Sequence, residues 1–172
     1  MISTRRPARF ASDADVGPVS TLNYGDTIRV EVPGEPKGWQ RTGHRVAINK
    51  RGRHVAVPYT QAQTRAEQGA IKWFANVAMR GRAPLEGPLC LSVMAYMAIP
   101  ASWSHKKRAD ALAGLIFPTG KPDVDNIIKL LADAVNKLVW RDDAQVVSAS
   151  VWKRYDAHPR LVFEVSRAVV TE

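Results

Sequence analysis

The sequence predicts a single α/β domain of the α+β type, in which a mixed sheet of about five strands packs with two main helices. The chain has 172 residues and is 45% hydrophobic, which is enough for one core and too little for two comfortable domains. Five or six short segments alternate apolar and polar residues, and two longer segments repeat apolar residues at helical spacing. No internal period indicates a repeat protein.

The first element that we expect is a strand from Thr27 to Val32. Ile28, Val30 and Val32 share one face of it, and charged residues take the other face, so the strand should be half buried. Residues 1–25 lie outside the predicted domain, and we expect them to form a disordered basic tail. The domain itself is therefore expected over residues 26–172.

A basic hairpin is expected next. Pro33 to Gly38 interrupts regular structure because it contains two prolines and two glycines. Asn49 to Gly52 then has the composition of a hairpin tip between short apolar runs at 46–48 and 55–57. Such a hairpin would carry several cations on one projecting element.

The first helix is expected from Gln61 to about Arg80. The aromatic pair Trp73 and Phe74 is expected to pack in the core rather than to stack on bases, because large apolar side chains are usually buried. The apolar residues at helical spacing are Ala66, Ala70, Phe74, Val77 and Ala78.

A long strand from Leu89 to Ile99 is expected after this helix, since apolar residues occupy every second position. Pro100 to Gly120 is a basic connection with at most a short helix between Ala109 and Ile116. A connection of this length in a compact domain is often functional, although a solvated surface excursion explains its composition equally well.

The second main helix is expected from Asp125 to about Leu138, with Asp125 as its cap. Its apolar stripe combines Ile127, Leu131, Ala134 and Leu138, with Ile128 and Val135 beside it. Two strands then complete the chain, from Val146 to Trp152 and from Leu161 to Val165.

The formal net charge is +9, from 25 Lys and Arg against 16 Asp and Glu. Such a field concentrates polyanions, so nucleic acid is the first candidate partner, although many small proteins are basic without binding it. The single cysteine, Cys90, excludes an internal disulfide and a cysteine-based metal cage, which fits a reducing, cytoplasmic setting. No apolar run is long enough for a membrane span, and no apolar signal segment begins the chain.

Acidic residues gather between Lys121 and Asp143, in a chain that is otherwise basic. If Asp123 and Asp125 lie in extended backbone before the helix, their side chains point the same way. The helix and its closing turn would return Asp143 at the head of a strand, while the adjacent Asp142 would face the opposite side. Three carboxylates without cysteine or paired histidine favour Mg²⁺ or Mn²⁺ over Zn²⁺.

Lys129 follows Asp125 by one helical turn, so it should lie over this acidic site. Its ammonium could offset the charge that grows on a phosphate in the transition state. The alternative is an ordinary ion pair with Asp125 or Asp133, and each acid also has a purely structural explanation as a cap, a turn or a solvated helix residue. We expect Asp133 to be structural.

The motif resembles the signature of the RusA-type crossover-junction endodeoxyribonucleases, which are common in bacteria and their prophages. The resemblance rests on Lys121-Pro122-Asp123-Val124-Asp125-Asn126, Lys129, Asp133-Ala134 and Trp140-Arg141-Asp142-Asp143-Ala144-Gln145-Val146, in this order and spacing. It implies an α/β homodimer that resolves four-way DNA junctions by paired nicks in recombination and repair, with bound Mg²⁺.

Carried over to this chain, the resemblance makes Asp123, Asp125 and Asp143 the metal-binding catalytic acids, Lys129 the catalytic lysine and Asp142 a supporting acid. Two departures stand out: Asn136-Lys137 replaces a common glycine after the helix, and Gly38-Trp39-Gln40 interrupts the basic segment. Other metal nucleases and non-catalytic nucleic-acid-binding proteins are the alternatives. The cations that we expect to contact DNA are Lys37, Arg41, Arg45, Arg51, Arg53, Lys106, Lys107, Arg108 and Lys121.

Overall fold

The computed structural model describes residues 27–40, 43–48, 50–59 and 61–168. The predicted tail at 1–25 and Arg41 lie outside these residues, and the side chain of Arg45 is not described. In the part of the chain that is described, no helix has the length and apolar character needed to cross a membrane.

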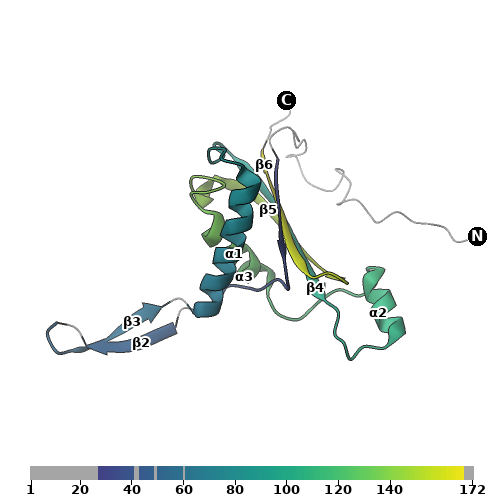
Figure 1. Ribbon diagram of the computed structural model, residues 1–172, viewed down its shortest axis with the longest axis horizontal. Coiled ribbons are helices and arrows are strands. Elements are labelled where there is room, and N and C mark those ends of the chain that lie inside the picture. Colours follow the sequence, from purple (N-terminus) through teal and green to yellow (C-terminus); the bar gives the residue numbers. More distant parts are fainter. Residues whose placement is uncertain (1–26, 41–42, 49, 60, 169–172) are drawn as a thin grey trace, which may run out of the picture.

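The core of the molecule is a mixed four-stranded sheet, which confirms the predicted fold class. Its strands are β1 (Ile28–Pro33), β4 (Leu89–Ala98), β5 (Val146–Asp156) and β6 (Arg160–Arg167), in the order β1-β6-β4-β5. β4 pairs in parallel with β5 and antiparallel with β6, and β1 pairs antiparallel with β6 (Figure 1). The side chains of β4 alternate as predicted, so that Leu89, Leu91, Val93, Ala95 and Met97 are buried.

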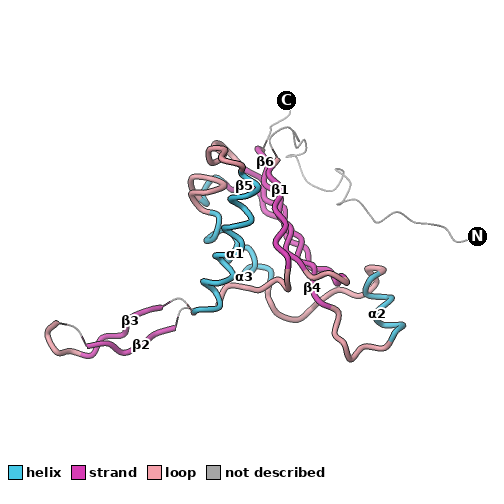
Figure 2. Tube along the Cα trace, viewed as in Figure 1, coloured by secondary structure: helices cyan, strands magenta, loops and turns pink. Residues whose placement is uncertain are grey.

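The predicted hairpin is present but does not join the sheet. β2 (Gly43–Ile48) and β3 (His54–Tyr59) form a separate two-stranded ribbon, which extends away from the sheet and helices in Figures 1 and 2. Val46 and Ile48 on this ribbon are 71% and 67% exposed. The sheet therefore has four strands instead of about five, because the ribbon pairs with itself alone.

Two helices cover one face of the sheet: α1 (Ala62–Met79) and α3 (Val124–Val135) lie together on that side in Figure 1. The third, α2 (His105–Leu112), lies on the long connection after β4. It begins before the expected Ala109 because the hydroxyl of Ser104 caps it, accepting a 3.4 Å hydrogen bond from the N–H of Lys107.

The predicted inner face of α1 was wrong in part. Ala66 is exposed and Val77 is 55% exposed, whereas the buried stripe consists of Thr64, Ile71, Ala75 and Met79. Alanines carry little weight in choosing a helix face, so the larger Ile71 and Met79 set the orientation. Trp73 consequently is 61% exposed instead of buried, and only its neighbour Phe74 packs against the core.

Candidate active site

The first two acids lie where a loop enters α3. The helix begins at Val124, so Asp123 occupies the N-cap position in extended backbone and Asp125 is already in the first helical turn. The expected side-by-side arrangement in an extended segment is therefore wrong, and Asp125 is not the cap. Both carboxylates are exposed at the helix N-terminus, where the helix dipole stabilises negative charge.

A lysine from the sheet fixes the loop that carries Asp123. The ammonium of Lys153 donates hydrogen bonds to the backbone oxygens of Gly120, at 2.6 Å, and Pro122, at 3.0 Å. Lys153 is paired with Ala95 in the parallel β4–β5 ladder, at an inward-facing position of β5. Sequence reasoning missed this residue, although a cation between Val151 and Tyr155 on the inner face of a strand was a usable signal.

A second support comes from the segment that follows β1. The N–H of Trp39 donates a 2.9 Å hydrogen bond to the backbone oxygen of Asn126 in α3. Lys37 and Gln40 tie the same segment to α1, through a 2.9 Å ion pair with Glu67 and a 3.0 Å hydrogen bond with Gln63. The segment therefore bridges the two helices beside the acidic loop.

An open groove of about 840 Å³ lies between this segment and the loop. Trp39, Gln40, Lys121 and Asp123 line it, together with Gln61 and Gln63 at the start of α1. A volume of this size is typical of ligand sites. Asp123 therefore faces a space that could accommodate part of a nucleic-acid strand.

The turn after α3 delivers the third acid. The backbone leaves the helical conformation at Asn136, with ψ of 136°, and Lys137 follows in a left-handed conformation with φ of 64°, so the helix ends at Val135 instead of Leu138. Val139 and Trp140 then insert into the core with no exposed surface, and the N–H of Leu85 bonds to the oxygen of Val139 at 2.8 Å. Lys137 thus fills the left-handed position of the turn, for which a glycine is usual.

Asp143 is held directly by the buried tryptophan. The indole N–H of Trp140 donates a 2.7 Å hydrogen bond to Oδ1 of Asp143. β5 begins at Val146, as predicted, and Asp143 precedes it. The extended backbone expected at Asp143 is wrong, because Asp143 starts the short 3₁₀ turn Asp143–Gln145. One carboxylate oxygen of Asp143 thus has a fixed position.

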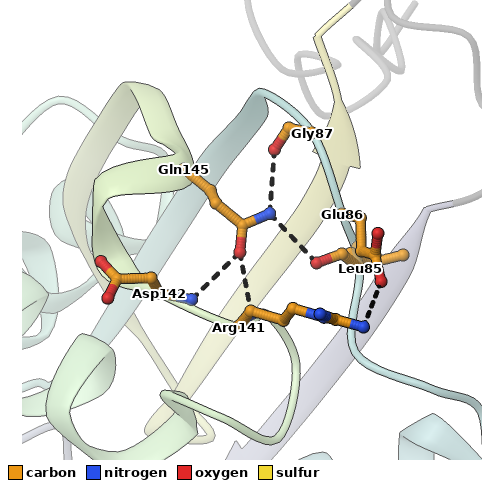
Figure 3. A network of polar contacts seen from close by, with 6 residues as sticks. All are labelled: Leu85, Glu86, Gly87, Arg141, Asp142 and Gln145. Carbon is orange, nitrogen blue, oxygen red and sulfur yellow. Dashed lines mark hydrogen bonds and ion pairs between the residues drawn. The ribbon is translucent and has the colours of Figure 1, made fainter.

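Asp142 caps the N-terminus of the same turn. Its carboxylate accepts a 2.8 Å hydrogen bond from the N–H of Ala144, while the side-chain oxygen of Gln145 accepts from the N–H groups of Arg141 and Asp142. The amide of Gln145 also donates to the backbone oxygens of Leu85 and Gly87, which anchors the turn to the segment before β4 (Figure 3). Asp142 thus has a structural role beside Asp143.

Lys129 and Asp133 lie one helical turn apart on α3. Burial raises the pKa of the Asp133 carboxyl, the nearby charge of Lys129 lowers it, and the charge of Asp143 raises it further. The expectation that Asp133 is structural stays a prediction, and the charge of Asp143 acts on the pKa of its carboxyl. Among the described residues, Lys129 forms no ion pair with Asp125 or Asp133, and its ammonium lies 3.8 Å from the centroid of the Trp39 ring.

Comparison with known proteins decides the family. The model of the endodeoxyribonuclease RusA family matches residues 33–166, which include every acid described above. The chain belongs to the RusA endodeoxyribonuclease family. Uncharacterized protein YqaN of Bacillus subtilis (strain 168) is 36% identical to it over 141 residues, covering 79% of this chain and 93% of YqaN. The chain is thus a junction-resolving endonuclease, a hydrolase of phosphodiester bonds in DNA.

RusA-family nucleases are generally metal-dependent, and the oxygen-only donors of this site suit a hard cation. The residue types of the site therefore suit a metal ion. Their positions do not yet form a metal site, because within the described ranges no three His, Cys, Asp or Glu side chains converge closely enough to hold an ion. Asp123 and Asp125 are exposed at one end of α3, and Asp143 comes from the turn beyond the other end. A bound cation would have to draw these carboxylates together.

The predicted DNA contacts occupy separate elements of this nuclease. Lys121 is exposed in the groove beside Asp123. On α2, Lys106 forms an ion pair with Asp110 at 2.9 Å, and just before it the Trp103 ring lies 3.9 Å from the ammonium of Lys107. The remaining described cations of the set are Lys37 beside the groove, Arg51 and Arg53 at the end of the ribbon, and Arg108 on α2.

Proposed function

We propose that the protein is a Mg²⁺-dependent Holliday-junction resolvase that cuts two symmetry-related strands of a four-way DNA junction in recombination and repair. The observation that carries the proposal is the position of Asp123 and Lys129, in a chain of net charge +9. Asp123 lines a groove at the entrance of α3, and the ammonium of Lys129 rests on another residue of that groove, Trp39. Acids placed where DNA should bind oppose binding unless a cation joins them to phosphate.

Asp123, Asp125 and Asp143 would hold the metal ion, for which Mn²⁺ is a second candidate. When bound, the ion would polarise the scissile phosphate and lower the pKa of the attacking water. Lys129 contributes positive charge next to the phosphate as negative charge grows on its oxygens. Asp142 supports Asp143 through the cap of its turn.

The basic residues of the ribbon and of α2 provide the sequence-independent part of DNA binding. Figure 1 shows the ribbon and α2 extending from the domain in opposite directions, with the loop that enters α3 between them. Cations on both elements allow one DNA arm to be held on each side of the acids, by contacts with phosphates. Such contacts hold DNA by its backbone, which suits recognition of a branched shape.

The active form in this proposal is a homodimer. A four-way junction with two-fold symmetry presents two equivalent strands, and a two-fold protein interface sets two active sites at a fixed separation. A monomer would cut only one of the two equivalent strands and would leave the junction unresolved. We further propose that the protein acts in the cytoplasm of a bacterium and is encoded by the bacterium or by a phage.

The test is cleavage of a synthetic four-way junction with Mg²⁺ by the wild type and by Asp123→Asn, Asp125→Asn and Lys129→Met. Each variant should lose about 100-fold or more in cleavage rate, because each removes several kcal/mol of charge stabilisation. Glu31→Gln, which neutralises an exposed carboxylate on β1, should cut like the wild type. Junction affinity of the two active-site Asp→Asn variants should stay equal or increase, since the change removes repulsion of phosphate.

Flap and linear duplex substrates of equal length separate the alternatives. Preferential nicking of flaps would show a different metal nuclease acting through the same acids. Junction binding without nicking at any Mg²⁺ or Mn²⁺ concentration would show a non-catalytic nucleic-acid-binding protein. Unchanged cutting by Asp123→Asn would remove the site assignment itself.

A further inference from the structure

The Trp39 ring contacts the lysine of the proposed active site. The ammonium of Lys129 lies 3.8 Å from the ring centroid, well within the range of a cation–π interaction. Two carboxylates compete for this ammonium, because Asp125 precedes it by one turn and Asp133 follows it by one turn. In the described part of the chain, Lys129 pairs with neither.

The backbone on which Trp39 stands is fixed against the first turn of α3. The N–H of Trp39 bonds to the backbone oxygen of Asn126 at 2.9 Å. At Gly38, an added Cβ would lie 2.8 Å from Cβ of Pro122 and 3.0 Å from Cβ of Asn126, so a side chain there would force the segment away. Gly38 therefore permits the close approach that brings the ring to Lys129.

The other flank of the segment is fixed to α1. Lys37 pairs with Glu67 at 2.9 Å, and the amide of Gln40 donates to the side-chain oxygen of Gln63 at 3.0 Å. The ring of Trp39 is itself partly buried against the core. Its position is thus determined by contacts that do not involve Lys129.

We propose that Trp39 is a positioning residue for DNA cleavage, whose ring holds the ammonium of Lys129 beside the Asp123 groove and out of ion pairs with Asp125 and Asp133. An ammonium above a ring keeps N–H groups directed away from the ring, available to a phosphate oxygen. Without the ring, the flexible lysine side chain would turn to a neighbouring carboxylate. The inference rests on the proposed function, since it takes Lys129 as the residue that meets the scissile phosphate.

The test compares Trp39→Leu and Trp39→Phe in single-turnover cleavage of a four-way junction, with saturating protein and Mg²⁺. Trp39→Leu should lower the cleavage rate about 5- to 30-fold, the value of a partly desolvated cation–π contact expressed as a rate. Trp39→Phe should lose less, because it keeps an aromatic ring. Trp73→Leu, the same change at an exposed tryptophan of α1, should cut at the wild-type rate.

A second measurement distinguishes positioning from support of the fold. In a Lys129→Met background, Trp39→Leu should have no further effect on the rate, because the lysine through which it acts is gone. Junction dissociation constants and melting temperatures are measured in parallel, and Trp39→Leu should bind within about twofold of the wild type. Gly38→Ala, which keeps both side chains but displaces the ring, should reproduce part of the rate loss.

The outcomes separate this inference from the proposed function. A wild-type rate for Trp39→Leu, or an equal rate loss with and without Lys129, would overturn the positioning role while resolvase activity stands. A Lys129→Met variant that cuts at the wild-type rate would instead overturn the role of Lys129 in the proposed function, and the inference for Trp39 with it. Parallel losses of binding and melting temperature in Trp39→Leu would identify Trp39 as a folding residue and also overturn the inference.

Discussion

Replacing Trp140 with phenylalanine tests whether a buried hydrogen bond sets the position of Asp143. Trp140 has no exposed surface, and its indole N–H donates to the Asp143 carboxylate at 2.7 Å. Phenylalanine keeps an aromatic ring in the core but has no donor. The substitution therefore removes the bond that fixes one oxygen of Asp143 and leaves a small cavity.

The expected cost has two parts. A hydrogen bond to a charged acceptor contributes about 1.5–3 kcal/mol, and the lower value applies here because Asp143 is half exposed. The lost ring atoms remove a further ~2 kcal/mol of apolar burial. Trp140→Phe should therefore lower the free energy of unfolding by about 3–4 kcal/mol, which a domain of ordinary stability survives at low temperature.

Two measurements separate these parts. In a double-mutant cycle with Asp143→Ala, which removes the acceptor, urea denaturation should give a coupling between Trp140 and Asp143 of about 1–2 kcal/mol. Cleavage is then measured at a temperature where each variant is fully folded. Trp140→Phe should cut more slowly than a Phe163→Leu control, which opens a cavity in the core at β6.

Additive effects of Trp140→Phe and Asp143→Ala on the free energy of unfolding would show that the hydrogen bond contributes nothing to stability. Equal cleavage rates for Trp140→Phe and Phe163→Leu would show that the fixed oxygen of Asp143 does not matter for catalysis. Either result would refute the reasoning that the core positions this acid.

Three further predictions concern other parts of the molecule. Lys153→Met should lower the cleavage rate about 10-fold by releasing the loop that carries Asp123, with Lys72→Met as the exposed control, and a wild-type rate would contradict this. Arg51→Ala with Arg53→Ala should weaken junction binding and reduce the slope of log K against log salt by about 2, whereas an unchanged slope would place DNA elsewhere. Burial raises the pKa of Asp156, but the hydrogen bonds that it accepts outweigh burial and leave the pKa below its usual value. The ionised Asp156 therefore stabilises the folded protein at pH above the ordinary carboxyl pKa, and this stabilisation is lost as pH falls through the lowered pKa. Acid unfolding, followed by circular dichroism, should consequently depend less steeply on pH in that range for Asp156→Asn than for the wild type.

Local pattern predicted the elements whose cause is local. Strict alternation over Leu89 to Ile99 placed β4 with its inner face correct, and Pro122 marked the entrance of α3 to within one residue of its first helical position. The face of α1 was harder, because several alanines gave two overlapping stripes and the correct one depends on packing of Ile71 and Met79. Tertiary contacts, not periodicity, made that choice.

The site shows the same division between local and distant causes. The residue types and order of Asp123, Asp125, Lys129 and Asp143 were readable from the chain, as was their relation by a helix and a turn. Their supports were not readable, since Trp39 is 90 residues from Lys129 by number and Lys153 is 31 residues from Pro122. Such contacts depend on how β5 and the segment after β1 pack around α3.

Three groups of the proposed site are held by contacts from outside their own elements. Trp140 from the core holds Asp143, Lys153 from β5 holds the loop of Asp123, and Trp39 holds Lys129. The fold fixes these supports, whereas Asp123 and Asp125 are exposed and Asp143 is half exposed, so a bound cation would have to bring the carboxylates together. Mutations of the supporting residues Trp140, Lys153 and Trp39 should therefore be as informative as mutations of the acids.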